Sequence, residues 1–182
     1  AQGKNTVENW DKLIIDDAKK YASDDILMNF VDNHDENSWN GTIQSRLGAA
    51  EEDMTALTYV MPGMPIQYSG NEYGLKHSLK FFEKDSIPKT KGKMWPLLEK
   101  LGKLKTDNVA LNGGKSAADY KRLSSENKDV LVFERNKKEP FQNLGAVFLF
   151  RIFKFSNWYI SYFVIRKSYI LKSPIILIIF FI

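Results

Sequence analysis

The sequence contains no cysteine and only two histidines among its 182 residues. Without cysteine, the chain can form neither a disulfide framework nor a thiolate metal site. The two histidines, His34 and His77, are too few for a zinc site built on imidazoles. These absences exclude disulfide-stabilised and zinc-centred small domains.

Acidic residues are missing from the last part of the chain. Residues 141–182 hold five Lys or Arg and no Asp or Glu, whereas residues 1–140 hold 21 basic and 22 acidic residues. The formal charge of +4 therefore comes from the tail, and the first 140 residues offer no basic face for nucleic acid. We expect no nucleic-acid partner.

The tail, residues 141–182, ends in an apolar run that begins at Pro174. A spanning helix needs about 20 mostly apolar residues, and Arg166, Lys167 and Lys172 interrupt the tail before that length is reached. We therefore do not expect a membrane anchor. Out-of-frame translation or a truncation product explains this composition better. A small membrane-surface protein is an alternative that rests on the tail alone.

A cluster of polar and aromatic side chains follows the short apolar run 26–28. Within residues 30–39 it contains three carboxylates, two amides, a histidine and a tryptophan. An apolar run followed by such a cluster predicts a buried strand, residues 26–31, which delivers side chains to a site at its C-terminal end. By itself the cluster is equally typical of a hydrogen-bonded loop.

Three blocks in this order resemble the last third of the catalytic barrel in the α-amylase family, glycoside hydrolase family 13. They are residues 30–35 (Phe-Val-Asp-Asn-His-Asp), residues 61–74 (Met-Pro-Gly-Met-Pro-Ile-Gln-Tyr-Ser-Gly-Asn-Glu-Tyr-Gly) and residues 79–85 (Leu-Lys-Phe-Phe-Glu-Lys-Asp). The resemblance covers roughly residues 5–136, and the third block is most similar to bacterial members. Asn71 departs from the glutamine usual in the family, which leaves the fine substrate preference open.

The fold class that the resemblance implies is α/β: a C-terminal fragment of a (β/α)8 TIM barrel followed by the beginning of an all-β domain. A complete barrel needs about 250 residues, so we expect this chain to be a piece of a longer enzyme. The predicted boundaries are 1–112 for the barrel part, 113–140 for the start of the β domain and 141–182 for the unmatched tail.

Periodicity predicts helices over residues 6–22, 44–59 and 94–105, and strands over 26–31 and 66–69. Alternation predicts a hairpin of residues 120–124 and 130–135. Asn5 and Glu8 have the spacing of a capping box for the first helix. Its apolar stripe, which we expect to pack in the core, contains Trp10, Leu13, Ile14, Ala18 and Tyr21.

The resemblance also implies roles for individual residues. Asp35 matches the third essential carboxylate of the family, which binds sugar hydroxyls and favours the charged, distorted sugar. His34 matches the histidine that hydrogen-bonds the same sugar, and Asp32 and Asn33 are expected to support the site. Trp39 stacks on a sugar ring or packs in the core. The nucleophile and the acid/base lie on earlier strands outside this chain.

The function implied is that of a retaining glycosidase that cleaves α-1,4-glucosidic bonds in starch-like glucans or maltooligosaccharides. We expect the fragment alone to be inactive, because it lacks two of the three carboxylates. A transglycosylase or isomerase of the same family, or a non-catalytic carbohydrate-binding relative, are the alternatives. Calcium stays open for the full-length parent, with no metal site evident in this sequence. Family members are often periplasmic or secreted.

Overall fold

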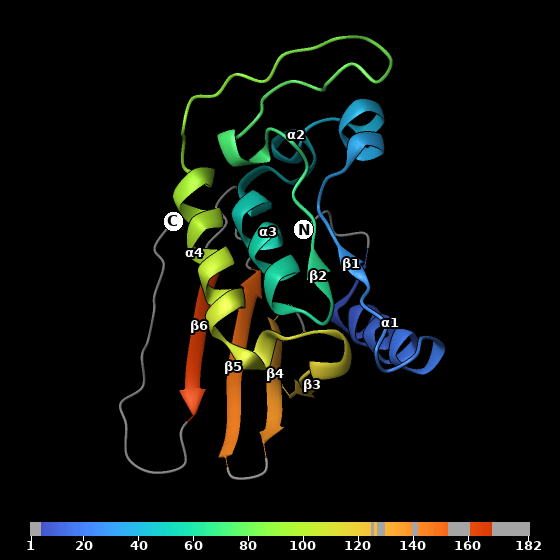
Figure 1. Cartoon of the computed structure of the whole chain (residues 1–182), viewed down its shortest axis with the longest axis vertical. Coiled ribbons are helices and arrows are strands. Elements are labelled where there is room, and N and C mark those ends of the chain that lie inside the picture. Colours follow the sequence, from blue (N-terminus) through green and yellow to red (C-terminus); the bar gives the residue numbers. More distant parts are fainter. Residues whose placement is uncertain (1–4, 125, 127–129, 140–141, 153–160, 169–182) are drawn as a thin grey trace.

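The computed structural model describes residues 5–124, 126, 130–139, 142–152 and 161–168 (Figure 1). The helices are α1 (Val7–Lys20), α2 (Ile43–Leu47), α3 (Glu51–Val60) and α4 (Met94–Asp107). The strands are β1 (Met28–Asn29), β2 (Met64–Pro65), β3 (Asp119–Leu123), β4 (Val130–Glu139), β5 (Gln142–Ile152) and β6 (Ser161–Ser168). Short helical turns complete the chain, among them a π-helical turn at Glu36–Asn40 and 3₁₀ turns at Gly48–Ala50 and Val109–Leu111.

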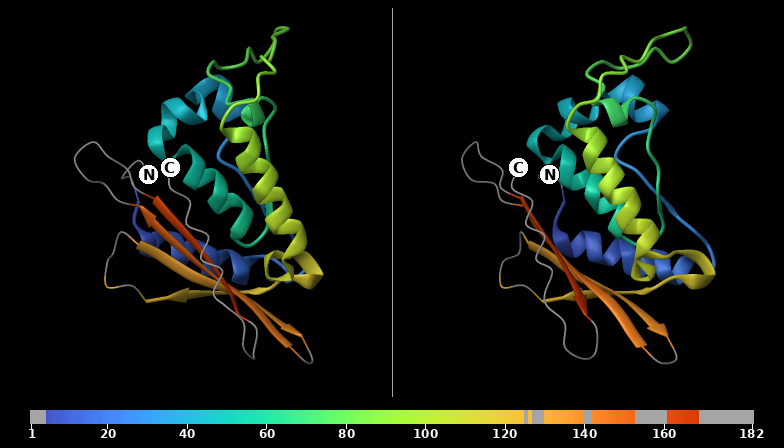
Figure 2. Two further views of the ribbon diagram at one scale, coloured as in Figure 1. Left: turned by 90° about the vertical axis from the view of Figure 1, so that its left-hand side faces the viewer. Right: turned by 60° about the vertical axis from the view of Figure 1, so that its left-hand side comes forward.

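Helices α3 and α4 lie side by side over one face of a four-stranded antiparallel sheet in the order β3-β4-β5-β6 (Figure 2). Apolar side chains fill the space between these layers. The buried cluster contains Ala56, Leu57, Tyr59, Val60, Leu101, Ala110, Leu111, Leu131 and Phe133. It contains residues from both sides of position 112, so the helical part and the sheet share one core, and the division into domains there stays a prediction.

Strands β1 and β2 pair in parallel, with Met28 opposite Met64 and Asn29 opposite Pro65. Strand β1 is shorter than predicted, and the predicted strand 66–69 is wrong, because β2 lies just before that range. The flanking bonds are Met64 N–H to Leu27 O (2.9 Å) and Ile66 N–H to Asn29 O (2.8 Å). Every second N–H points at the neighbouring strand, and Pro65, which has none, occupies the position between them.

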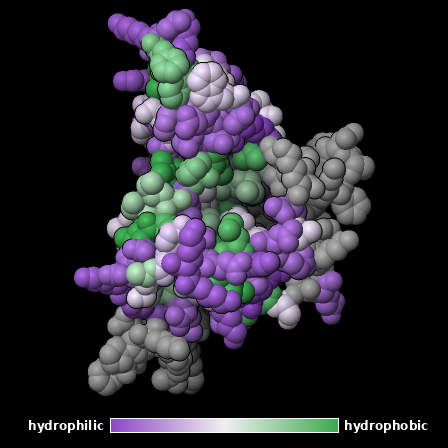
Figure 3. All heavy atoms as spheres, turned by 90° about the vertical axis from the view of Figure 1, so that its right-hand side faces the viewer, coloured by the Kyte–Doolittle hydropathy of each residue, from purple (hydrophilic) through white to green (hydrophobic). Residues whose placement is uncertain are grey.

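The prediction that residues 26–31 form a buried strand is wrong. Ile26, Met28 and Phe30, with Met64 on β2, are between 43% and 62% exposed. We call these four residues the open strand face; the face that carries β1 shows a band of apolar atoms across its middle (Figure 3). The physical reason is that β1 pairs only with β2, and the described residues form no closed barrel around it.

The predicted helix 44–59 is in fact two helices. Gly48 adopts a positive φ of 56° and ends α2, because this conformation cannot continue a right-handed helix. Glu51, Glu52 and Asp53 then occupy the first turn of α3, where negative charge complements the helix dipole. The chain changes direction at a glycine that the apolar periodicity alone does not mark.

The first helix differs from its prediction in its cap and in its burial. Thr6 is the N-cap, since its hydroxyl oxygen accepts from Asn9 N–H at 3.2 Å, and the proposed Asn5–Glu8 capping box is wrong. Trp10 packs against the core, whereas Leu13 and Tyr21 are exposed. The helix makes a polar contact with β3 through Tyr120 Oη, which donates to Asp11 Oδ1 at 3.1 Å.

The predictions for the next elements are confirmed. Helix α4 begins at Met94 with Pro96 in its first turn, where no intrahelical donor is lost. Strands β3 and β4 form the predicted antiparallel pair. The sheet continues beyond residue 140, because β5 pairs with β4 and β6 with β5. The out-of-frame origin of the tail stays a prediction, and residues 169–182, including the apolar end, lie outside the described residues.

The buried Arg135 joins the sheet to the helical part, and the half-buried Lys105 joins α4 to the segments before β2 and before β3. The Arg135 guanidinium on β4 donates to Ala118 O at 3.0 Å and to Val60 O, the last residue of α3, at 3.3 Å. Lys105 Nζ on α4 donates to the carbonyls of Gly63 and Leu111, both at 2.9 Å. Burial, with some repulsion from Arg135, lowers the pKa of Lys105 to about 8.

Candidate functional site

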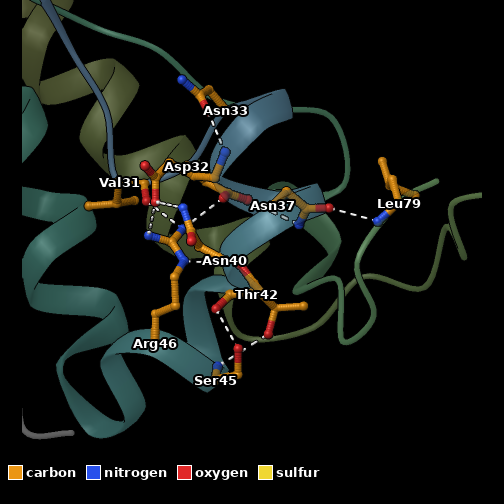
Figure 4. Close-up of polar contacts among 11 residues, drawn as sticks. Val31, Asp32, Asn33, Asn37, Asn40, Thr42, Ser45, Arg46 and Leu79 are labelled. Carbon is orange, nitrogen blue, oxygen red and sulfur yellow. Dashed lines mark hydrogen bonds and ion pairs between the residues drawn. The ribbon is translucent and has the colours of Figure 1, made fainter. Parts of the chain in front are cut away.

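The polar segment that follows β1 is organised by Asn33. Its side-chain oxygen accepts from Glu36 N–H at 2.7 Å, and its carbonyl accepts from Asn37 N–H at 2.9 Å (Figure 4). These bonds start the turn Glu36–Asn40, which begins seven residues beyond the end of β1. These bonds hold the segment in place, and the role predicted for Asn33 in supporting a sugar site stays a prediction.

Asp32 is a buried carboxylate, 1% exposed, and Arg46 reaches it from α2. Arg46 Nη2 lies 2.7 Å from Asp32 Oδ1 and also donates to Val31 O at 2.7 Å. Its Nε donates to Gly41 O at 3.0 Å, and Nη1 lies 3.2 Å from Glu36 Oε2. We call Asp32, Arg46 and these acceptors the Asp32–Arg46 hub.

The Asp32–Arg46 hub has a structural role. Burial raises the pKa of Asp32, while the Arg46 guanidinium and the Asn37 amide act in the opposite direction. Because Asp32 is covered and its oxygens already accept these bonds, it is unable to contact a ligand directly. It fixes helix α2 against the segment that follows β1 instead, and its predicted role in supporting a sugar site stays a prediction.

A second connection joins the segment to the loop of residues 74–93. Asn37, which is buried, accepts from Leu79 N–H at 2.7 Å through its side-chain oxygen. Ser38 Oγ donates to Leu79 O at 2.8 Å. Two polar contacts to one backbone position hold this part of the loop beside residues 34–39, although 41 or 42 positions separate the partners.

His34 and Asp35 differ from Asp32 in being open to solvent. Their side chains are 63% and 61% exposed, and His34 Nε2 lies 3.6 Å from Asp35 Oδ2. Both lie in the segment after β1, five and six residues beyond its last residue, Asn29. The structure thus brings together the two residues predicted to bind sugar, and separates them from the buried carboxylate three positions earlier in the chain.

The aromatic neighbours of this pair come from two segments. Trp39 is 64% exposed, which excludes the alternative that it packs in the core. Phe81 has its ring centroid 5.6 Å from that of His34 and 5.5 Å from that of Trp39. The ring centroid of Phe82 lies 4.7 Å from that of Phe81, and the two rings meet edge to face. No role was predicted for Phe81 and Phe82 from the sequence, although two adjacent aromatic residues in a polar loop are a signal of a contact surface.

The second motif block forms a tight turn. Glu72 accepts from Gly70 N–H at 2.9 Å through a carboxylate oxygen, and Asn71 is buried with no acceptor within reach of its Nδ2 among the described residues. Gly70 and Gly74 on either side both adopt a positive φ. Glu72 is therefore engaged in local structure.

Among the described residues, no group of three histidine or carboxylate side chains is placed to hold a metal ion. Within the same ranges, no helix is long and apolar enough to cross a bilayer.

No protein-family model matches the chain, and no curated protein matches it either. The family resemblance of the three sequence blocks remains a prediction.

Proposed function

We propose that this chain is the C-terminal part of the catalytic domain of a retaining glycoside hydrolase that acts on α-1,4-linked glucans. Asp35 is the charge-stabilising carboxylate in this proposal, and His34 binds the same sugar. The nucleophile and the acid/base would come from strands that precede residue 1. The chain by itself is then expected to leave starch and maltooligosaccharides intact.

The observation that supports this proposal best is the difference in burial and contacts between the two aspartates. Asp32 is buried and bonded to Arg46, while Asp35 and His34 lie next to each other in solvent at the end of β1. Glycoside cleavage passes through an oxocarbenium-like transition state, in which positive charge develops on the sugar. An exposed carboxylate held on a fixed turn can face that charge, and a neutral imidazole beside it can donate and accept hydrogen bonds.

The open strand face supports the view that the sheet continues into further strands. Parallel sheets are normally covered on both faces, and two strands are too few to be stable by themselves. Yet β1 and β2 expose Ile26, Met28, Phe30 and Met64. Additional β/α units would cover these side chains and would place their own C-terminal ends beside His34 and Asp35.

The test is Asp35→Asn in the full-length enzyme. The amide is nearly isosteric but carries no charge, so the loss should fall mainly on kcat, with a smaller change in KM. Losing one preorganised electrostatic contact of this kind costs on the order of 10²- to 10³-fold in rate. His34→Ala removes a neutral hydrogen bond and should have a milder effect. A kcat for Asp35→Asn within a few-fold of the parent, at an unchanged Tm, would refute the assignment.

A further inference from the structure

An exposed aromatic surface extends from the His34–Asp35 pair onto the loop of residues 74–93. It consists of His34, Trp39, Phe81 and Phe82, which we call the aromatic platform. Phe82 is 86% exposed and Trp39 is 64% exposed. Figure 3 shows apolar atoms among hydrophilic ones at the upper end of the molecule, where this loop lies. Large apolar side chains gathered in solvent indicate a binding surface more often than chance exposure.

The platform is held in place by the backbone contacts beneath it. Leu79 is bonded to both Asn37 and Ser38, one residue before Lys80 and two before Phe81. Lys80 N–H donates to Asp85 Oδ2 at 3.1 Å, and Lys80 Nζ lies 2.7 Å from Glu83 Oε2, so the loop is also bonded across Phe81 and Phe82. The rings are therefore presented by two segments that are fastened together, which lowers the entropy lost when a ligand binds.

We propose that the aromatic platform is a stacking surface for an α-1,4-linked glucose oligomer, continuous with the His34–Asp35 contact. The pyranose ring has one apolar face of C–H groups, which packs on an aromatic ring, and an edge of hydroxyls, which needs donors and acceptors. The platform supplies the rings, and His34 and Asp35 supply the polar groups at its border. The inference rests on the proposed function and assigns Trp39, Phe81 and Phe82 to the same site.

The charge around the platform is mixed. Residues 74–93 hold six lysines and two carboxylates, and single-stranded nucleic acids also stack on aromatic rings beside positive charge. At the platform itself, Lys80 is paired with Glu83, and Asp35 lies beside His34, where it would repel a phosphate but not an uncharged sugar. An oligosaccharide is therefore the occupant we propose, and oligo(dT) is the competing outcome of the test.

The experiment is an NMR titration of the whole chain with maltohexaose, with cellohexaose and oligo(dT) as competing ligand classes. We expect saturable binding of maltohexaose that shifts amides of residues 34–39 and 79–83. Phe82→Ala and Trp39→Ala should each raise the Kd roughly three- to tenfold, the range expected for losing one aromatic stacking contact. Tyr21→Ala is the matched control, since it removes an exposed aromatic ring from α1, and it should leave the Kd unchanged.

Three results would overturn the proposal: no saturable binding of maltohexaose, a Kd unaffected by both platform variants, or tighter binding of cellohexaose or oligo(dT). Phe82 and Trp39 are exposed, so their variants should keep the Tm of the parent chain, and a change in Kd would report the surface itself. This test is separate from catalysis. If the platform variants bind maltohexaose as the parent does, the predicted effect of Asp35→Asn on kcat is not affected. If Asp35→Asn has a normal kcat, the stacking surface is not contradicted.

Discussion

The most informative stability prediction concerns Arg46→Met, which removes the cation of the Asp32–Arg46 hub and keeps the bulk of the side chain. Asp32 would then be a buried carboxylate without its partner, since it is 1% exposed. Removing one member of a buried ion pair costs about 3–5 kcal/mol, because the remaining charge stays desolvated. Val31 O and Gly41 O would lose their donor in the same variant. Out of a typical total of about 5–15 kcal/mol, this is a severe loss.

The control for this prediction is a surface ion pair with the same separation. Lys103 Nζ lies 2.7 Å from Asp107 Oδ2, as Arg46 lies 2.7 Å from Asp32, but its side chains are 78% and 57% exposed. Exposed pairs contribute about 0–1 kcal/mol, so Lys103→Met should change the free energy of unfolding little. Urea denaturation followed by circular dichroism at pH 7 gives both values. An Arg46→Met loss no larger than that of Lys103→Met would refute the view that the hub fixes the site.

The hub also predicts a dependence on pH. Burial already raises the pKa of Asp32, and removing Arg46 takes away the main influence that opposes this shift. A carboxyl whose pKa is raised in the folded state stabilises the fold below its unfolded pKa, and this contribution is lost as the pH rises through the folded pKa. The stability gap between Arg46→Met and the parent chain should therefore narrow as the pH is lowered from 7 toward 5.

Two further predictions concern the half-buried Lys105 and the glycines Gly48 and Gly63. The pKa of Lys105 is lowered from its ordinary 10.5 to about 8. Between these two values the unfolded chain binds more protons than the folded chain, so the free energy of unfolding should rise from about pH 8 to about pH 10. In Lys105→Met, measured by the same denaturation, most of this rise should disappear. Gly48 and Gly63 both have positive φ, but a Cβ at Gly48 would meet nothing within 4 Å, whereas one at Gly63 would collide with Leu27 O. Gly48→Ala should cost about 1 kcal/mol and Gly63→Ala about 3 kcal/mol or more, because it displaces β1 from β2; equal costs would contradict the register described for these strands.

The sequence predicted best those elements whose signals are local. Helix α4 was predictable because Pro96 marks its first turn and its leucines recur at helical spacing. The β3–β4 pair was predictable from alternation on both sides of a polar turn. The parallel pairing of β1 and β2 was expected, but the position of β2 was not, because the register is set by contacts between Leu27–Asn29 and Met64–Ile66 that the local sequence pattern does not report.

What the sequence did not predict depends on contacts between distant residues. Whether the apolar residues of β1 are buried depends on neighbouring strands, and the described residues provide only β2. The break at Gly48 depends on a backbone conformation that periodicity does not report. In the candidate site, the motif gave His34 and Asp35, but the roles of Arg46 and Leu79 arise only when α2 and the loop fold back onto residues 32–38. Phe81 joins the platform for the same reason.

The most direct test of the central claim compares Asp35→Asn with Asp32→Asn in the full-length enzyme, measuring kcat and Tm for both. We predict that Asp35→Asn loses on the order of 10²- to 10³-fold in kcat with an unchanged Tm. Asp32→Asn should lower the Tm, because the buried Arg46 charge then loses its counter-ion. A normal kcat in Asp35→Asn, together with a Tm loss equal to that of Asp32→Asn, would show that both aspartates are structural and would contradict the account.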